Sequence, residues 1–311
     1  MERFLVTGAL GCLGAWTALR LLEGRHGVVA ADLGDDTRRL RLVLGDRLEE
    51  LTLARADITD LPALERLLDE HEITRVLHLA ALQVPFCREN PPLGAAVNVV
   101  GTVNVLEAVA RRRDRVRGLV YASSIAVYGP DDAGGEYERT RPETHYGVTK
   151  VANEGNARIY WQDERLPSIG LRPHTIYGPA RDQGVTSAPT QAMLAAARGA
   201  PYHIPWGGYS RYHHARDVAD AFVAAALAEL DGARVYTLPA ERLHMSEVVA
   251  AIEAAVPGSA GRITFDDVEL PFPDELEAGS FAAEVADLDW TPLAAGAGET
   301  IEHFRRVGAR A

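Results

Sequence analysis

Short apolar runs alternate with segments of helical periodicity along the first half of the chain. The runs RFLVT, GVVAAD, LTLARAD, RVLHLA and GLVYASS are rich in apolar and β-branched residues and short enough to be buried strands. Between them, LPALERLLDEH and VNVVGTVNVLEAVARRR repeat apolar residues every three or four positions, which predicts helices. This rhythm predicts an α/β protein with a Rossmann-type, doubly wound parallel sheet, whose ligands bind beyond the carboxyl ends of the strands.

The alternation loosens after about residue 175. Pro and Gly in GPARDQG, GAPYHIPWGGYS and VELPFPDELEAGS separate shorter elements there. We therefore expect a first domain over residues 1–175 and a smaller C-terminal α/β lobe over residues 176–311. The segments RVYTLPA and EVVAAIEAAV indicate that the chain crosses between the two more than once, with crossover segments near 209–240.

Composition and charge narrow the classes of function. A chain of 311 residues with 47% hydrophobic content can bury one large core, or one core with an attached lobe. The formal net charge of -12 argues against nucleic-acid binding, because phosphate neutralisation needs a concentrated basic surface. The basic run RRRDRVR, at 111–117, follows a helical pattern, and we interpret it as a solvated helix end rather than a polyanion site.

The sequence carries no signal for export, membrane insertion or metal binding. The start MERFLVTG has no basic segment before a long apolar stretch, and no 18 apolar residues run together, so we expect a cytoplasmic protein that does not enter membranes. Cys12 and Cys87 cannot form a disulfide framework and lack metal-ligand spacing. The adjacent His213 and His214 project differently, so we expect satisfied polar contacts and no metal.

A glycine motif follows the first predicted strand. TGALGCLG, residues 7–14, places Gly8, Gly11 and Gly14 before a helix, where a pyrophosphate can bind the unpaired N–H groups. The next strand ends at Asp32, close to the spacing expected for a carboxylate on an adenosine ribose. Asp32 would repel a 2′-phosphate, which favours NAD over NADP. Arg38 and Arg39 could take such a phosphate, but we interpret both as solvent-facing.

A second pattern concerns a tyrosine, a lysine and a serine. Tyr146 and Lys150 lie one helical turn apart in YGVTK, so their side chains share a face, where an ammonium group favours the phenolate. The strand GLVYASS ends with the hydroxyls of Ser123 and Ser124, at the edge where a parallel sheet opens to ligand. Such pairs also occur by chance on helices, and serines often cap them. The order of the serines, Tyr146 and Lys150 along one chain favours a catalytic role for them.

These motifs together resemble a known family. TGALGCLG, Asp32, HLAA at 78–81, NVVGTVNVLEA at 98–108, YASSIAVYGP at 121–130, YGVTK and LRPHTIYGP at 171–179 are similar to the extended short-chain dehydrogenase/reductases, the NAD-dependent sugar epimerases and dehydratases. The resemblance implies an NAD-binding first domain and a lobe that mainly binds substrate. It also assigns positions to NAD: the three glycines to the pyrophosphate, Asp32 to the ribose, Asp57 and Ile58 to the adenine, and Ala80 and Ala81 to the nicotinamide side.

The resemblance also implies catalytic roles. Tyr146 would be the acid/base, Lys150 would hold the nicotinamide ribose and lower the phenol pKa, and Ser124 would orient the reacting hydroxyl. His174 is expected near the cofactor face, as pocket lining or core. Ile125 and Ala126 follow Ser124, where dehydratases of this family have an acidic pair. We therefore expect a sugar epimerase, with a net dehydrogenase as the alternative and a nucleotide-binding protein without turnover as the least favoured.

The substrate is less defined. Arg211, in SRYHHARDVADAF, matches the position at which nucleotide-sugar enzymes bind a diphosphate. However, Thr175 replaces a frequent asparagine, and the late arginine of these enzymes is absent, so a free sugar, sugar acid or polyol is an alternative to a nucleotide sugar. With such a substrate, Arg211 would hold a carboxylate or pair with Asp217. Gln83, Thr186 and Ser187 are further possible contacts, although the last two could cap a helix. By resemblance, we expect a homodimer formed through helices that include the one carrying Tyr146.

Overall fold

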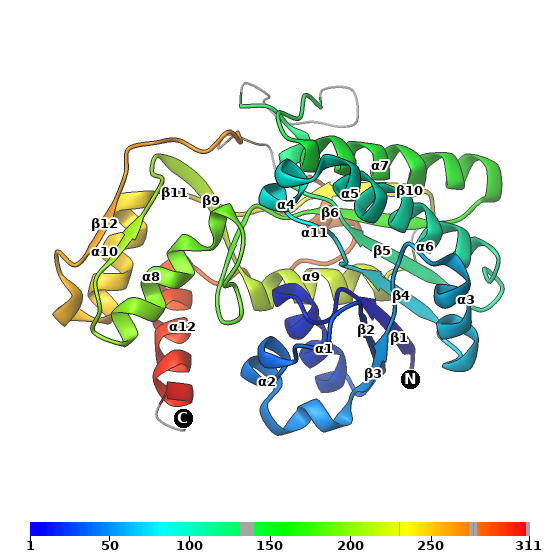
Figure 1. Ribbon diagram of the computed structural model, residues 1–311, viewed down its shortest axis with the longest axis horizontal. Coiled ribbons are helices and arrows are strands. Elements are labelled where there is room, and N and C mark those ends of the chain that lie inside the picture. The colour runs from blue at the N-terminus through cyan, green and yellow to red at the C-terminus, as the bar shows by residue number, and fades with distance from the viewer. Residues whose placement is uncertain (131–139, 230, 274–275, 277–278, 309–311) are drawn as a thin grey trace.

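The computed structural model describes residues 1–130, 140–229, 231–273, 276 and 279–308. Its largest sheet has seven parallel strands in the order β10-β6-β5-β4-β1-β2-β3. The order reverses between β1 and β4, which is where a doubly wound sheet opens a crevice for ligands. The predicted Rossmann-type fold is therefore confirmed (Figure 1). The strands are β1 (Arg3–Thr7), β2 (Gly27–Asp32), β3 (Thr52–Arg55), β4 (Arg75–His78), β5 (Gly118–Ala122), β6 (Ser168–Arg172) and β10 (Ala233–Thr237).

Helices cover both faces of this sheet, as Figure 1 shows. On β1, Phe4 and Val6 pack into one core and Leu5 into another, because successive side chains of a strand point to opposite faces. The run of apolar residues in RFLVT is thus explained by burial on both sides. The first core includes α1 (Cys12–Glu23), α2 (Arg38–Leu44) and α9 (Ala215–Leu227); the second includes α3 (Leu61–Glu70), α6 (Gly101–Ala110) and α7 (His145–Glu164).

One helical run in the described chain, Pro91–Ala110, is long and apolar enough to cross a bilayer, with a mean hydropathy of 1.6 over its most apolar window. It joins α5 (Pro91–Ala95), a π-helical turn over Ala96–Val100, and α6. In this fold 44% of that window is buried, and a core helix meets the same criterion of length and composition. The basic run that follows α6 is engaged with acidic side chains, since Arg112 and Arg115 both pair with Asp69.

The remaining elements pack around a separate apolar core. A three-stranded sheet has the order β11-β9-β7, and β8 pairs with β12 in parallel. Because α9 and β10 join the layers of the large sheet, the chain visits that sheet again after β9; the domain boundary at residue 175 stays a prediction. The elements are β7 (Thr175–Tyr177), β8 (Tyr202–Ile204), β9 (Tyr209–His214), β11 (Glu241–His244), β12 (Ile263–Phe265), α8 (Ala188–Ala197), α10 (Met245–Ala255) and α12 (Leu293–Gly308), with the short helices α4 (Val84–Glu89) and α11 (Phe281–Glu284).

Four of the described histidines are buried: His78, His174, His213 and His214. The ring of His78 lies between two hydroxyls, with Nδ1 2.7 Å from Thr7 Oγ1 and Nε2 3.0 Å from Thr102 Oγ1. His214 accepts a hydrogen bond from the backbone N–H of Arg216 and caps α9. Burial lowers the pKa of His78 to about 3 and those of His213 and His214 to about 4. Their rings are therefore neutral in the folded protein at neutral pH.

These shifts predict a loss of stability in mild acid. Each folded-state pKa lies below the ordinary value of 6.5, so each contribution is complete above pH 6.5 and is lost as the pH falls toward 4. At pH 5 each ring is expected to lower the free energy of unfolding by about 1–2 kcal/mol. Urea unfolding at pH 7 and pH 5 measures the difference. His214→Gln should reduce this difference between the two pH values, whereas the same change at the exposed His145 should not. Equal pH dependence of the free energy of unfolding in the unmodified protein and both variants would contradict this account.

Candidate active site

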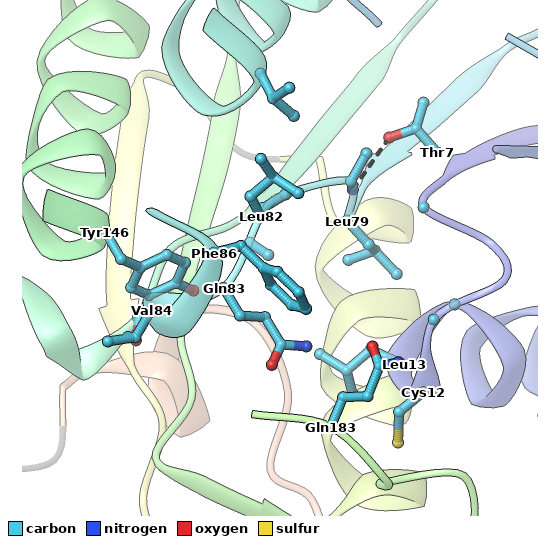
Figure 2. A pocket seen from close by; sticks show the side chains of 18 of the residues that line it. Thr7, Cys12, Leu13, Leu79, Leu82, Gln83, Val84, Phe86, Tyr146 and Gln183 are labelled. Atoms are coloured by element: carbon cyan, nitrogen blue, oxygen red, sulfur yellow. Dashed lines mark hydrogen bonds between the residues drawn. The ribbon is translucent and has the colours of Figure 1, made fainter. Parts of the chain in front are cut away.

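One cavity of about 740 Å³ lies at the carboxyl ends of β1, β2, β4 and β5. The glycine motif, α7 and the loop 178–187 complete its walls. Figure 2 shows Tyr146, Gln83 and Gln183 around this space, with Cys12 of α1 nearby. Arg211 and Ser187 are outside its described lining, and the Ser187 hydroxyl donates to the Gly184 carbonyl at 2.9 Å. The other predicted site residues line it: Gly8, Gly11, Gly14, Asp32, Asp57, Ile58, Ala80, Ala81, Gln83, Ser124, Tyr146, Lys150, His174, Thr175 and Thr186.

The glycine motif forms a cradle whose backbone packs too closely for side chains at Gly8 and Gly14. Gly8 has φ +71°, and a Cβ atom there would lie 2.5 Å from the Ala80 backbone nitrogen. A Cβ at Gly14 would lie 2.4 Å from the Gly8 carbonyl oxygen. Helix α1 begins after Gly11 without a side-chain cap, so its first N–H groups are free to bind an anion. Asp32 steadies the loop, since Oδ2 accepts from the Leu10 N–H at 3.0 Å.

The predicted catalytic side chains come from α7 and the end of β5. Thr144 caps α7, its hydroxyl accepting from the Gly147 N–H at 2.9 Å. Lys150 Nζ donates to the Ala122 carbonyl at 2.6 Å and lies 5.3 Å from the centre of the Tyr146 ring. Ser124 Oγ accepts from the Ala126 N–H at 3.1 Å and also makes a hydrogen bond with Tyr146. The three side chains are thus held together from separate elements.

Burial governs the charge state of these groups. It raises the pKa of Tyr146 to about 12, although the Ser124 hydrogen bond and the charge of Arg181 lower it. Burial also lowers the pKa of Lys150 to about 8. Desolvation is the largest cause of both shifts, because both groups lose water on burial. The effect of Lys150 on the phenol pKa stays a prediction.

A buried ion pair holds α7 against the sheet below these residues. Glu154 and Arg172 are 1% and 3% exposed at their side chains, and two contacts join them, from Nε to Oε1 at 2.7 Å and from Nη2 to Oε2 at 2.5 Å. Ser123 Oγ donates to Glu154 Oε1 at 2.5 Å. The pair thereby ties α7 to β6 and to the residue after β5. Both Ser123 and Ser124 line the cavity, and Ser123 has this structural role in addition.

Arg211 is absent from the described lining of the cavity. Its Nη1 donates to the Ala240 carbonyl at 2.7 Å, on the other side of β9 from its neighbour Ser210. Ser210 Oγ instead lies 3.0 Å from the hydroxyl of Thr175, which does line the cavity. The alternation of side chains along β9 therefore directs Ser210, and not Arg211, toward the cavity-lining Thr175.

Sequence reasoning missed several residues of the site. Arg39 is not solvent-facing as interpreted: its side chain is 18% exposed and lines the cavity, with Nε 2.7 Å from Asp182 Oδ1 and Nη1 3.3 Å from the Leu10 carbonyl. Arg38, by contrast, is 76% exposed, as expected. Arg181 also lines the cavity. No local sequence pattern marks Arg39 or Arg181 as a residue of the site. Only contacts between distant segments, such as that of Arg39 with Asp182, reveal their positions.

Asn98 supports the site from the π-helical turn. Its Oδ1 accepts from the Leu82 N–H at 2.7 Å and its Nδ2 donates to the Leu82 carbonyl at 2.9 Å. This pair of hydrogen bonds fixes the loop after β4, which carries Ala80, Ala81 and Gln83. The π-helical turn directs Asn98 toward that loop. Such a departure from α-helical geometry often marks functional sites.

The buried pair predicts a large difference between two substitutions on α7. Glu154→Gln leaves the Arg172 guanidinium buried opposite a neutral amide, and should lower the free energy of unfolding by about 3–5 kcal/mol. Glu164 lies on the same helix and forms an exposed ion pair with Arg113, which follows α6. Glu164→Gln breaks this pair and should lower the free energy of unfolding by less than about 1 kcal/mol. Urea unfolding at pH 7 measures both. Similar losses for the two variants would show that the buried pair does not hold α7 in place.

Comparisons with known proteins agree with this geometry. The model of the NAD-dependent epimerase/dehydratase family matches residues 4–238. The UDP-glucose 4-epimerase of Mycolicibacterium smegmatis is 32% identical over 314 residues, which cover 97% of this chain and 98% of that protein. The structure of MoeE5 in complex with UDP-glucuronic acid and NAD is 27% identical, with a TM-score of 0.80 over 98% of this chain and 99% of the other. A consensus L-threonine 3-dehydrogenase, 23% identical, has a TM-score of 0.86 over 98% of this chain and 99% of the other, which shows the shared fold. The chain therefore belongs to the NAD-dependent epimerase/dehydratase family of extended short-chain dehydrogenase/reductases, and its cofactor is NAD.

Proposed function

We propose that this protein is a sugar epimerase that oxidises a secondary hydroxyl to a ketone and reduces the ketone again on its other face. The observation that carries this proposal is the placement of Tyr146, Ser124 and Lys150 in the same cavity as the glycine cradle. A base, a hydroxyl that orients substrate and a dinucleotide site in one cavity are what this oxidation requires. The similarity to a UDP-glucose 4-epimerase along nearly the whole chain supports the same reaction class.

The cavity fits a dinucleotide. Gly8 and Gly14 let the backbone of the motif pack tightly against Ala80 and against itself, and the start of α1, which no side chain caps among the described residues, offers N–H groups to a pyrophosphate. Asp32 would hold the adenosine ribose, and Lys150 the nicotinamide ribose. When bound, NAD accepts a hydride from the substrate carbon and, in an epimerase, returns it.

Tyr146 would exchange the proton of the substrate hydroxyl. Burial keeps its phenol protonated at neutral pH, and in this form the hydroxyl can donate a proton but cannot accept one. The groups of this chain that favour the phenolate are Ser124, through its hydrogen bond, and Arg181, through its charge. Ser124 would also fix the substrate oxygen beside the phenol. After Ser124 come Ile125 and Ala126, both buried and neither able to move a proton, so dehydration has no acid at this position.

A net dehydrogenase is the second candidate, and the position of Arg211 favours it. With Arg211 outside the described lining, the cavity lacks the cation that was expected to bind a diphosphate. A substrate without a nucleotide, such as a free sugar, sugar acid or polyol, would not need that cation. Gln83, Thr175 and Thr186 are proposed as its contacts, since all three line the cavity.

We further propose that the protein is a cytoplasmic homodimer. Four apolar side chains of α5, the π-helical turn and α7 are exposed in the single chain: Leu93 at 49%, Val100 at 51%, Val148 at 53% and Ile159 at 44%. A second copy of the same face could cover them, as in a symmetric interface. Helix α7, which carries Val148 and Ile159, also carries Tyr146. The interface would therefore pack against the helix that holds the catalytic tyrosine.

Tyr146→Phe tests the assigned acid/base. The substitution removes only the hydroxyl, and we expect turnover to fall by about 10³-fold or more while NAD binding is retained. Tyr209→Phe is the control, because it removes the hydroxyl of an exposed tyrosine outside the described cavity lining. Turnover and NAD titration of both variants give the answer, and unchanged turnover in the Tyr146 variant would contradict the mechanism.

A substrate panel separates the two candidate reactions. Nucleotide sugars, free sugars, aldonates and uronates are incubated with the NAD-loaded protein, and products are separated by chromatography while NADH absorbance is followed. An epimerase interconverts two sugars without net NADH, because it returns the hydride. A dehydrogenase accumulates NADH in proportion to product. Absence of both signals across the panel would reject the proposed function.

A further inference from the structure

The loop 178–187, which joins β7 to α8, is tied to the elements around the glycine motif at two places. The carbonyl of Pro179 accepts a hydrogen bond from Trp16 Nε1 of α1 at 2.9 Å. Three residues later, Asp182 Oδ1 lies 2.7 Å from Nε of Arg39, which belongs to α2. The loop therefore crosses from α1 to α2 on the side of the cavity that holds the motif, and its residues 180–183 line that cavity.

Arg39 connects this loop to the glycine motif itself. Its Nη1 donates to the Leu10 carbonyl at 3.3 Å, and the Leu10 N–H donates to Asp32, the residue assigned to the adenosine ribose. The side chain of Arg39 is 18% exposed and that of Asp182 is 41% exposed, and both residues line the cavity. The ion pair therefore lies at the rim of the cavity, between its interior and the solvent.

The backbone of the loop is strained between its two contacts. Ala180 has a φ of +74° and is buried. A residue with a Cβ atom keeps this left-handed conformation only where its surroundings impose it. Gly178 and Gly184 lie on either side, with φ of +121° and +93°. When the ion pair breaks, we expect the segment between these glycines to leave its closed position, because the strain favours other conformations and glycine changes conformation easily.

We propose that the ion pair between Asp182 and Arg39 is a latch, which holds the loop 178–187 closed and limits the rate at which NAD and NADH leave. The loop and the glycine cradle line one cavity, so the loop has to move away from the cradle before a dinucleotide is released. This inference rests on NAD as the cofactor, and not on which of the two candidate reactions the protein catalyses. An epimerase has particular use for such a latch, because the hydride must return to the substrate before NADH leaves.

Removing the Asp182 carboxylate distinguishes a latch from simple electrostatics. A carboxylate that lines the cavity repels an anionic dinucleotide, so charge alone predicts that Asp182→Asn slows the release of the cofactor. A latch predicts faster release, because the loop loses its contact with α2. The rate is measured by loading the protein with NADH, adding an excess of NAD and following NADH fluorescence. We expect Asp182→Asn to release NADH about 3–10-fold faster than the unmodified protein.

Further variants separate the latch from a general change of charge. Asp36→Asn breaks the exposed ion pair with Arg38, which lies outside the described cavity lining, and should leave the rate of release unchanged. Asp182→Glu keeps the charge and should restore most of the slow release. Arg39→Gln should speed up release, and adding Asp182→Asn to it should change the rate by less than about twofold, because the pair is already broken. The urea midpoint checks that each variant is folded, and Asp182→Ser carries the comparison if Asp182→Asn is not.

Unchanged or slower release of NADH by Asp182→Asn would overturn the latch. An equal acceleration in Asp36→Asn, or an effect of Asp182→Asn that persists at full size beside Arg39→Gln, would also overturn it, because either result shows that the ion pair is not the cause. So would a folded protein that binds neither NAD nor NADH. The proposed function is judged separately by the substrate panel: a protein with the expected release rates that converts no sugar keeps the latch and loses the proposed reaction.

Discussion

The buried pair of Glu154 and Arg172 is the interaction on which the geometry of the site depends. Tyr146, Lys150 and Glu154 follow one another at intervals of four residues, so they form a stripe along one face of α7. The first two project into the cavity, and the third is fixed to β6 through two contacts. Removing both charges from water is costly, and close bidentate contact offsets that cost. The pair therefore sets the position of α7, and with it the position of the Tyr146 phenol relative to the sheet.

A second set of contacts joins the two halves of the cavity. Asp182, in the loop 178–187, binds Arg39 of α2, and Arg39 in turn binds the carbonyl of Leu10 within the glycine motif. The same Leu10 donates its N–H to Asp32, the residue assigned to the adenosine ribose. The loop that presents Arg181 is thus tied through short contacts to the loop that would hold the cofactor. Ordering one of these loops helps to order the other, because they share a partner.

The sequence predicts the parts of the molecule that depend on local pattern. Strand and helix periodicity indicates the doubly wound sheet, and the glycine spacing indicates the cradle at the start of α1. It does not predict the register of β9, because a shift of one residue would exchange Ser210 for Arg211 beside Thr175, and no periodicity in SRYHHARD decides between them. The environment of Arg39 and Arg181 depends on contacts between distant segments, and so does the pKa of Tyr146. These properties follow from burial, which composition and spacing do not specify.

Burial also explains why the phenol of Tyr146 is protonated at neutral pH. The same loss of water raises the pKa of Tyr146 and lowers that of Lys150 to about 8, a value at which the lysine still carries its charge at pH 7. Ser124 and Arg181 favour the phenolate, but desolvation outweighs both. Proton transfer at Tyr146 therefore depends on the charges that lie beside the phenol, because burial by itself keeps the hydroxyl protonated.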